Sequence, residues 1–330
     1  MMSTLQVPQT SALSIHEQIE MFGLEACRDL VMTNNTLKPA ERKKQVRRLE
    51  AAQQAMLDLG IDDISYLHAG LCQTGLPHSK PDSDNEPWQR SNGKFHLIVE
   101  PGALVDPATG KAKMVGVPYG AKARLIFLHI NSEGMKSKHV YLGKSMSAWM
   151  RRLGLDVTGG KTGSIPQFKE QSKRLGRARF SFQFESENGI GISDTQIADK
   201  LHLWVSDDGP WLEEIELTDK FFDHLREHAV PLSDHAISYL SSSCLKLDLY
   251  AWLAWRLPKL GKPLRLSWDQ LKDTFSAQGE PGRLAERLKL ALPEVKDVYR
   301  DMNVEIARGG LLLKPSKPPI PKTLIAVSKK

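Results

Sequence analysis

The feature that most constrains the fold is an order of predicted elements that occurs twice in the 330 residues. Each series reads helix, short strand, helix, helix and strand hairpin, because apolar residues recur at spacings of three and four in the helices and of two in the strands. The first series is 121–135, 138–143, 145–153, 164–176 and 178–189; the second is 244–257, 263–268, 269–276, 282–295 and 304–315. This order is that of a winged helix, a helix-turn-helix variant with an appended hairpin. Since the two series share element order and not residue identity, we interpret them as a duplicated architecture.

We therefore predict an α+β fold of two tandem winged-helix domains with a helical N-terminal extension. The chain is long enough for two domains of ordinary size. The predicted units are a helical N-terminal region (1–73), a linker or mobile loop rich in Pro, Ser and charge (74–93), a first winged-helix domain (94–230), a second (231–320) and a basic tail (321–330). In the N-terminal region, apolar stripes predict one helix over 14–33 and another between Pro39 and Gly60.

Charge is segregated along the chain, whose net charge is +6. Residues 141–180 hold nine basic and two acidic residues, a net +7; residues 181–230 hold three and twelve, a net −9; residues 281–330 hold eleven and five, a net +6. Two basic zones that flank an acidic one indicate either solvated faces or two separate contacts with a polyanion.

The run GLDVTGGKTGS, residues 154–164, resembles a phosphate-binding loop but has the wrong spacing. The P-loop needs a glycine five residues before its Gly-Lys pair, and Leu155 stands there. The loop should also follow a buried strand, whereas SMSAWMRRLGL predicts a helix. We expect instead that Lys161, Thr162 and Ser164, at the start of a helix, donate to a nucleic-acid phosphate. Ser164 and Gln167 are predicted to form a capping box.

The helix predicted from Ile165 to Gly176 has one apolar face and one polar face. The polar side chains offer what a recognition helix uses in the major groove, amides and cations for bases and cations for phosphates. The candidate DNA-binding residues here, all expected to lie off the apolar face, are Gln167, Lys169, Glu170, Lys173, Arg174, Arg177 and Arg179. The alternative is an ordinary solvated helix face.

The second series offers a similar but less regular set. Leu284, Leu288 and Ala291 are expected to point inward, although Leu290 falls outward. The candidate DNA-binding residues are Arg283, Arg287 and Lys289 on the helix and Arg308, Lys314 and Lys317 on or beyond the hairpin, where a wing would meet the minor groove or phosphates. The ordinary solvated face remains an equal alternative here.

Other chemistry lacks a motif, so we expect no catalytic residues, no cofactor and no metal. Three distant cysteines form no Cys-x-x-Cys pair and suit a reducing cytosol. His224 and His228, four residues apart with His235 nearby, have no HExxH context and are interpreted as surface histidines. The N-terminus lacks signal-peptide features, and no apolar run approaches a membrane span, which predicts a cytoplasmic protein that does not contact membranes.

Four segments resemble the plasmid-encoded RepA-type replication initiators: PYGAKARLIFLHINSEG, VYLGKSMSAWMRRLGLDVTGGKTGSIPQFKEQSKRL, LDLYAWLAWRL and GGLLLKPSKP. The resemblance covers about residues 95–320, is most specific from Pro118 to Leu175, and leaves residues 1–93 outside. It implies winged-helix domains that bind repeated double-stranded DNA sites, iterons, at a plasmid origin. It also implies melting of adjacent DNA, recruitment of the host replication initiator and replicative helicase, and copy-number control through homodimers.

Two alternatives remain. A transcriptional repressor could use the same module and would need DNA binding without helicase contact. A P-loop NTPase would need nucleotide turnover.

Overall fold

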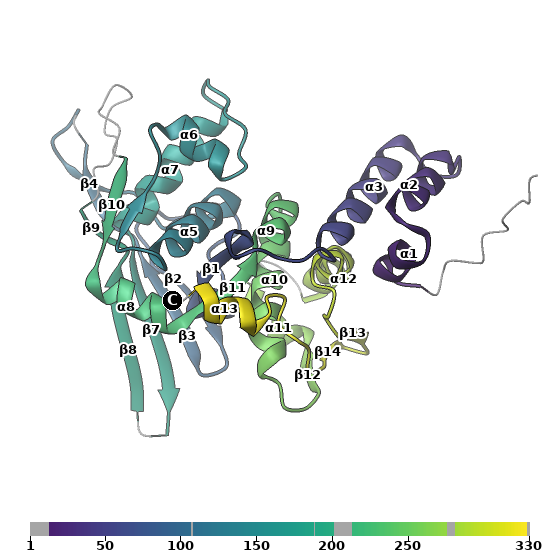
Figure 1. The fold of residues 1–330 in the computed structure, drawn as a ribbon. Coiled ribbons are helices and arrows are strands. Elements are labelled where there is room, and N and C mark those ends of the chain that lie inside the picture. Colours follow the sequence, from purple (N-terminus) through teal and green to yellow (C-terminus); the bar gives the residue numbers. More distant parts are fainter. Residues whose placement is uncertain (1–12, 107, 188, 201–212, 276–280, 329–330) are drawn as a thin grey trace, which may run out of the picture.

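The computed structural model describes residues 13–106, 108–187, 189–200, 213–275 and 281–328. Its N-terminal part is a small unit of three helices, α1 (Ile15–Phe22), α2 (Leu24–Thr33) and α3 (Pro39–Gln54). The single helix predicted over 14–33 is broken at Gly23, whose φ of 79° does not suit a helix. Figure 1 shows these helices at one end of the molecule. They are attached beside α12 (Pro281–Val298) by a partly buried ion pair, in which Arg48 Nε lies 2.7 Å from the carboxylate of the buried Asp297.

The first series of elements has the predicted order. It comprises α5 (Gly120–Gly134), β6 (His139–Tyr141), α6 (Met146–Arg152), α7 (Ser164–Arg177), β7 (Arg179–Ser186), β8 (Gly189–Gln196), β9 (Ala198–Lys200) and β10 (Glu214–Leu217). Its short strands form a three-stranded antiparallel sheet in the order β6-β10-β9.

The hairpin that follows α7 does not pair with the short strand of its own series. Strands β7 and β8 do not join β6 but lie in a four-stranded sheet, β2-β3-β7-β8, with β2 (Trp88–Asn92) and β3 (Phe95–Glu100). In this register Val99 lies opposite Phe180 and Leu97 opposite Phe182, and all four side chains are buried. A strand with alternating apolar residues is stabilised by a neighbouring strand that also buries apolar side chains. Strand β3 provides them, whereas in the three-residue β6 only Val140 is buried.

The second series also has the predicted order. It comprises α10 (Cys244–Arg256), the 3₁₀ turn η3 (Leu257–Lys259), β12 (Leu264–Ser267), α11 (Trp268–Phe275), α12, β13 (Val304–Ala307) and β14 (Gly310–Leu313). The sheet order is β12-β14-β13, and the hairpin turns at Gly309, which has a φ of 80°. At Gly310 a Cβ would lie 1.8 Å from the Leu266 carbonyl oxygen, so only glycine lets β14 approach β12 this closely.

The remaining helices and strands lie outside the two series. These are η2 (Ile61–Asp63), β1 (Ile64–His68), α4 (Ala69–Gln73), β4 (Ala103–Val105), β5 (Ala112–Met114), α8 (Asp219–His228), β11 (Ala229–Ser233), α9 (Asp234–Leu240) and α13 (Lys322–Ser328). Strands β1 and β11 lie far apart in the sequence but pair antiparallel along their whole length, from Ile64 opposite Ser233 to His68 opposite Ala229.

Two stretches expected to lie outside the domains pack into the fold. Residues 74–93, predicted to be a linker or mobile loop, contain strand β2 and the buried Leu76. In the predicted basic tail, α13 packs beside η2. Just before it, Ile320 is fully buried next to Ile64 and Tyr66. In the sequence analysis both stretches are assigned by their polar and charged residues, which do not predict these few apolar contacts.

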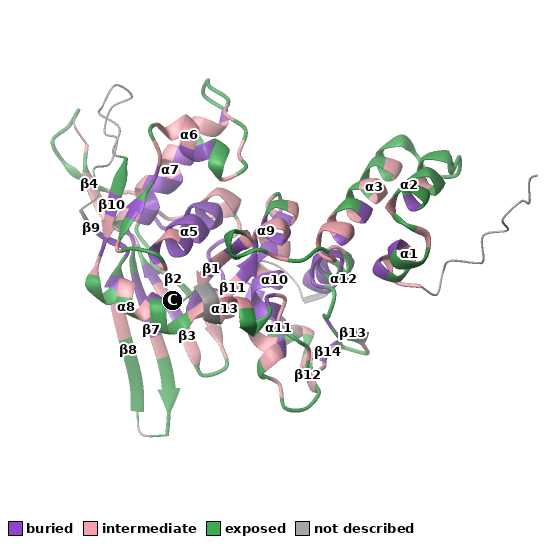
Figure 2. Ribbon diagram, in the orientation of Figure 1, coloured by how far each residue is buried: buried purple, intermediate pink, exposed green. Residues whose placement is uncertain are grey.

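The two halves share α5, as the buried residues in Figure 2 indicate. Leu125 and Leu128 of α5 belong to the core around α10 and α12, whereas Ile126 and Ile130 belong to the core around α7 and β7. Helix α5 therefore lies between two hydrophobic cores and contributes side chains to both.

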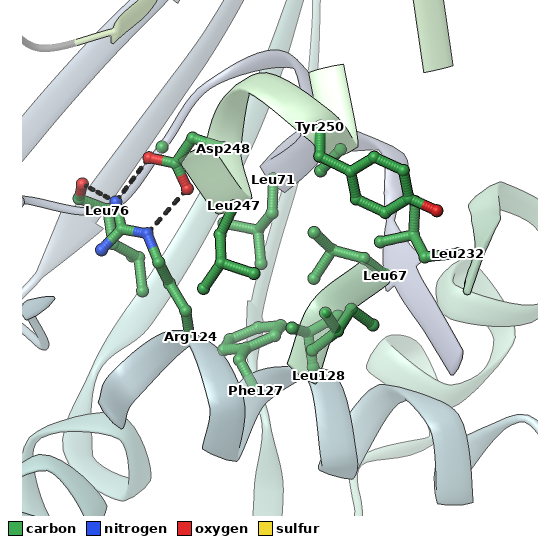
Figure 3. A pocket seen from close by; sticks show the side chains of 13 residues that line it. Leu67, Leu71, Leu76, Arg124, Phe127, Leu128, Leu232, Leu247, Asp248 and Tyr250 are labelled. Carbon is green, nitrogen blue, oxygen red and sulfur yellow. Dashed lines mark hydrogen bonds and ion pairs between the residues drawn. The ribbon is translucent and has the colours of Figure 1, made fainter. Parts of the chain in front are cut away.

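A buried ion pair fastens α5 to α10 next to a small apolar cavity of about 30 Å³. Arg124 donates to both carboxylate oxygens of Asp248 at 2.7 Å and to the Leu76 carbonyl at 2.6 Å, as Figure 3 shows. Burial raises the pKa of Asp248, but Arg124 and His78 outweigh burial and bring it down to about 2. The segment predicted to be a linker thus supplies part of the joint between the halves.

Candidate nucleic-acid interface

Helix α7 is held by its apolar face, as its sequence pattern predicts. Phe168 and Leu175 are buried, and the Phe168 ring meets Trp149 of α6 edge-on with centroids 4.9 Å apart. Because successive residues turn by about 100°, Lys169, Lys173 and Arg177 fall together on the opposite side. Lys169 and Lys173 are partly exposed and Arg177 is exposed.

The glycine-rich loop before α7 is closed by its own hydrogen bonds. Ser164 Oγ donates to the Asp156 carbonyl at 2.6 Å and accepts from the Thr158 amide at 2.9 Å. Ser164 is therefore engaged within the loop and does not point to a phosphate. Lys161 and Thr162 are exposed.

The predicted capping box is wrong. The N-cap residue is Gly163, which has no side-chain cap, and Ser164 is the first residue of the helix. Gln167 instead donates to the Thr162 carbonyl at 3.3 Å and accepts from Lys122 Nζ at 2.8 Å. The amide thus ties the loop to α7 and to the start of α5.

Arg174 is not on the polar surface of α7. Only 2% of it is exposed, and its guanidinium lies 2.9 Å from Asp84, 2.7 Å from Glu170 and 3.1 Å from the Val117 carbonyl. An arginine that is buried among these oxygens does not reach the surface where DNA would bind, and Glu170 is engaged by the same ion pair. The residues beyond it are also engaged: Arg177 Nε donates to the Ala103 carbonyl at 3.0 Å, and Arg179 lies 2.8 Å from Asp194.

Helix α12 presents a comparable surface in the second half. Leu284, Leu288 and Ala291 are buried as predicted. Arg283, Arg287 and Lys289 are exposed over the N-terminal half of the helix. Leu290 is 73% exposed among them, which leaves an apolar side chain within a basic surface.

The hairpin β13–β14 extends from the same half. Arg308 is exposed at its turn, and its carbonyl oxygen accepts from Arg265. Lys314 pairs with Glu305 across the hairpin, which occupies its ammonium group. Lys317 is exposed, and its carbonyl accepts from Tyr299 Oη at 2.7 Å.

The structure brings further cations to the first surface that the sequence analysis did not single out. Lys122 lies at the start of α5 against Gln167. Lys111 and Lys113 lie on the β4–β5 hairpin beside α7. The two lysines of GKAKM, beside turn residues, were the only indication of this surface in the sequence. They lie in no helical pattern or known motif, so the sequence analysis did not single them out.

His228 is exposed as predicted, but His224 lies between it and the buried His68, with ring centroids 4.5 Å and 4.7 Å away. Burial lowers the pKa of His68 to about 3, with smaller contributions from His224 and His228. His68 Nδ1 accepts from the Gly70 amide at 3.0 Å, so its Nε2 donates to His224 Nδ1 at 2.8 Å. Within the residues that the structure describes, no group of three metal-ligating side chains has a geometry for a metal ion, and no helix is long and apolar enough to cross a membrane.

Comparison with known proteins gives one family. Residues 117–270 match the family model described as "Plasmid encoded RepA protein". No curated protein matches the sequence.

Two solved structures of RctB are similar. The crystal structure of RctB domains 2-3 (RctB-155-483) has 11% identity and a TM-score of 0.46, and covers 79% of this chain and 100% of that one. The selenomethionine derivative of domains 2 and 3 has 11% identity and a TM-score of 0.44, and covers 82% and 99%.

Proposed function

Since residues 117–270 match the family model of the plasmid-encoded RepA protein, we propose that this chain is a replication initiator of that family and that it initiates plasmid replication by binding iterons, repeated double-stranded DNA sites at the plasmid origin. Binding of several copies side by side would bend and strain the DNA and so promote melting of an adjacent stretch. The host replication initiator and replicative helicase are then recruited to the melted DNA. Homodimers that do not start replication would limit copy number.

The observation that carries this proposal is a shared sheet order. In β6-β10-β9 and in β12-β14-β13, the first short strand pairs with the third, which pairs with the second. Each sheet accompanies three helices, α5, α6 and α7 or α10, α11 and α12. Three helices with a strand and a hairpin are the elements of a winged helix, which supports our proposal of two such domains, the first enlarged by the insertion of β7 and β8.

The third helix of each proposed domain carries cations that solvent can reach. On α7 and its loop they are Lys161 and Lys173. On α12 and its hairpin they are Arg283, Arg287 and Arg308. A third helix in the major groove with a hairpin beside it matches the way such modules dock.

The test is a hydroxyl-radical footprint of the full chain on the DNA that flanks its own gene. We expect protection of a repeated site, in blocks about one helical turn apart. Uniform protection of unrelated DNA at the same salt concentration would contradict a site-specific initiator.

A second measurement distinguishes an initiator from a repressor. The gene supplied in trans should allow a plasmid that carries only the repeats and adjacent DNA to replicate. Failure to replicate while the footprint persists would indicate the repressor.

A further inference from the structure

The hairpin of β4 (Ala103–Val105) and β5 (Ala112–Met114) stands apart from the other sheets. It pairs with no third strand among the residues described, and Figure 1 shows it projecting at the edge of the molecule near α7. Val105 is 61% exposed, and residues 108–113 are exposed throughout. A projecting two-stranded hairpin is marginally stable by itself, so something must hold it in place.

The base of the hairpin is fixed to the C-terminal half of α7. Arg177 Nε donates to the Ala103 carbonyl at 3.0 Å, and the chain packs so closely there that a Cβ on Gly102 would lie 2.1 Å from the Arg177 carbonyl oxygen. Beyond the end of β5, the buried Arg174 donates to the Val117 carbonyl. Gly116 has a φ of 77°, and a Cβ there would lie 2.1 Å from Arg174. These contacts hold the hairpin in a set position beside the helix.

A pocket of about 350 Å³ separates the hairpin from α7. The cations that line it are Lys80, Lys113, Lys173 and Arg174, and the acids are Asp84, Asp106 and Glu170. Arg174 pairs with both Asp84 and Glu170, and Lys80 pairs with Asp84. Asp106 accepts from the Ala108 amide at 3.0 Å. The acids are thus engaged within the protein.

Lys111 and Lys113 are exposed, and neither ammonium group is paired with a carboxylate of the described residues. Lys113 faces the groove whose other wall carries Lys173, which belongs to the proposed DNA surface of α7. Lysines on both walls of a groove suit a phosphodiester backbone. Because the hairpin is held in place before binding, ordering it costs little free energy.

We propose that the β4–β5 hairpin is a second DNA-contacting arm of the first half, in which Lys111 and Lys113 bind phosphates that flank the groove entered by α7. This inference rests on the proposed function and adds a surface to it. The partner is double-stranded DNA, and the contact is to its backbone, so the arm contributes affinity and orientation but no base discrimination.

The test compares full-length Lys111→Ala/Lys113→Ala with Lys94→Ala, which removes an exposed lysine from the turn between β2 and β3. Loss of two phosphate contacts should weaken DNA binding about thirtyfold at about 0.15 M salt and reduce the slope of log K against log salt by about two. The footprint should lose protection only at the phosphates that flank the α7 contacts. Lys111→Arg/Lys113→Arg should bind like the wild type, and the thermal midpoint of every variant should stay unchanged.

Two results would overturn the inference in distinguishable ways. If the wild-type protein binds no DNA, the proposed function fails and the arm fails with it. If the wild type binds, Lys173→Ala weakens binding, and Lys111→Ala/Lys113→Ala behaves like Lys94→Ala, the arm alone is wrong.

Discussion

At the scale of single residues, neighbours on one helix have opposite roles. Lys173 and Arg174 are adjacent in a basic run, yet Lys173 lies at the surface and Arg174 is 2% exposed. The sequence pattern could not separate them, because the partner that draws Arg174 inward, Asp84, lies in a segment far earlier in the chain. Such a long-range pair has no local signature.

We therefore predict that Arg174→Ala destabilises the protein whereas Lys173→Ala does not. Removing the buried guanidinium takes an ion-pair partner from Glu170 and one of two from Asp84, and it leaves the Val117 carbonyl without its donor, which costs about 1–3 kcal/mol. Urea unfolding of the two variants checks this. Lys173→Ala should keep the wild-type midpoint but weaken DNA binding, by about 1–3 kcal/mol and with one relaxed site position if Lys173 contacts a base. If it contacts a phosphate, binding to all sequences should weaken and the salt slope fall by about one. Equal stability of both variants would contradict the burial of Arg174.

His68 makes stability depend on pH. Burial lowers its pKa from 6.5 to about 3 in the folded protein, so the unfolded chain binds more protons between these values. The contribution is fully present above about pH 6.5 and is lost as the pH falls toward 3. A single histidine of this kind lowers the free energy of unfolding by about 2 kcal/mol between about pH 7.5 and pH 5.

We expect His68→Asn, whose side-chain oxygen can still accept from the Gly70 amide, to reduce this pH dependence. Burial also lowers the pKa of His129, to about 4, but His129 is present in both proteins, so the difference between them isolates His68. Parallel curves of unfolding free energy against pH for wild type and variant would show that His68 does not carry the effect.

At the scale of elements, helices are predictable from sequence and strand partners are not. The apolar stripe that predicts α7 and the buried Leu284 and Leu288 of α12 are local patterns, and the structure confirms them. The pairing of β7 with β3 depends on contacts between distant segments, at Phe95 and Phe184 for example. Composition was also misleading: the polar stretch 74–93 holds a strand, and the N-cap residue of α7 is Gly163, not Ser164.

The glycine-rich loop offers a matched pair of substitutions. A Cβ on Gly163 would lie 2.3 Å from the Gly159 carbonyl oxygen, whereas a Cβ on Gly159 meets nothing within 4 Å. Gly163→Ala should therefore open the loop, cost about 1–3 kcal/mol of stability and weaken DNA binding by displacing Lys161. Gly159→Ala should leave both properties unchanged. The checks are thermal unfolding and fluorescence titration with DNA. A matching loss in both variants would mean that the close contact at Gly163 is not what shapes the loop.

At the scale of the whole molecule, the two halves cannot be separated cleanly. Strand β11 ends the first half and pairs with β1, and α5 contributes to both cores. A cut between residues 230 and 231 would split β11 and expose apolar surface on α5. Tests of how each half holds DNA therefore need the intact chain with surface substitutions.

We predict that each half grips its own DNA segment. The basic zones around α7 and α12 are separated by residues 181–230, whose net charge is −9 and which would repel phosphate. Lys161→Ala/Lys173→Ala should remove one block of footprint protection, and Arg283→Ala/Arg287→Ala should remove the other. Each pair should weaken binding about thirtyfold at about 0.15 M salt if the side chains contact phosphates. The four changes together should approach about a thousandfold, because distant sites act independently.

The matched control is Lys94→Ala/Lys220→Ala, which removes two exposed lysines that lie on neither helix. This variant should keep wild-type affinity and both blocks of protection, because it loses the same two positive charges as each test variant but at positions away from α7 and α12. Suppose instead that Arg283→Ala/Arg287→Ala retains full affinity and protection while Lys161→Ala/Lys173→Ala loses both. Then α7 alone holds the repeat, and the exposed cations and Leu290 of α12 belong to a surface for another copy of the chain or a replication protein.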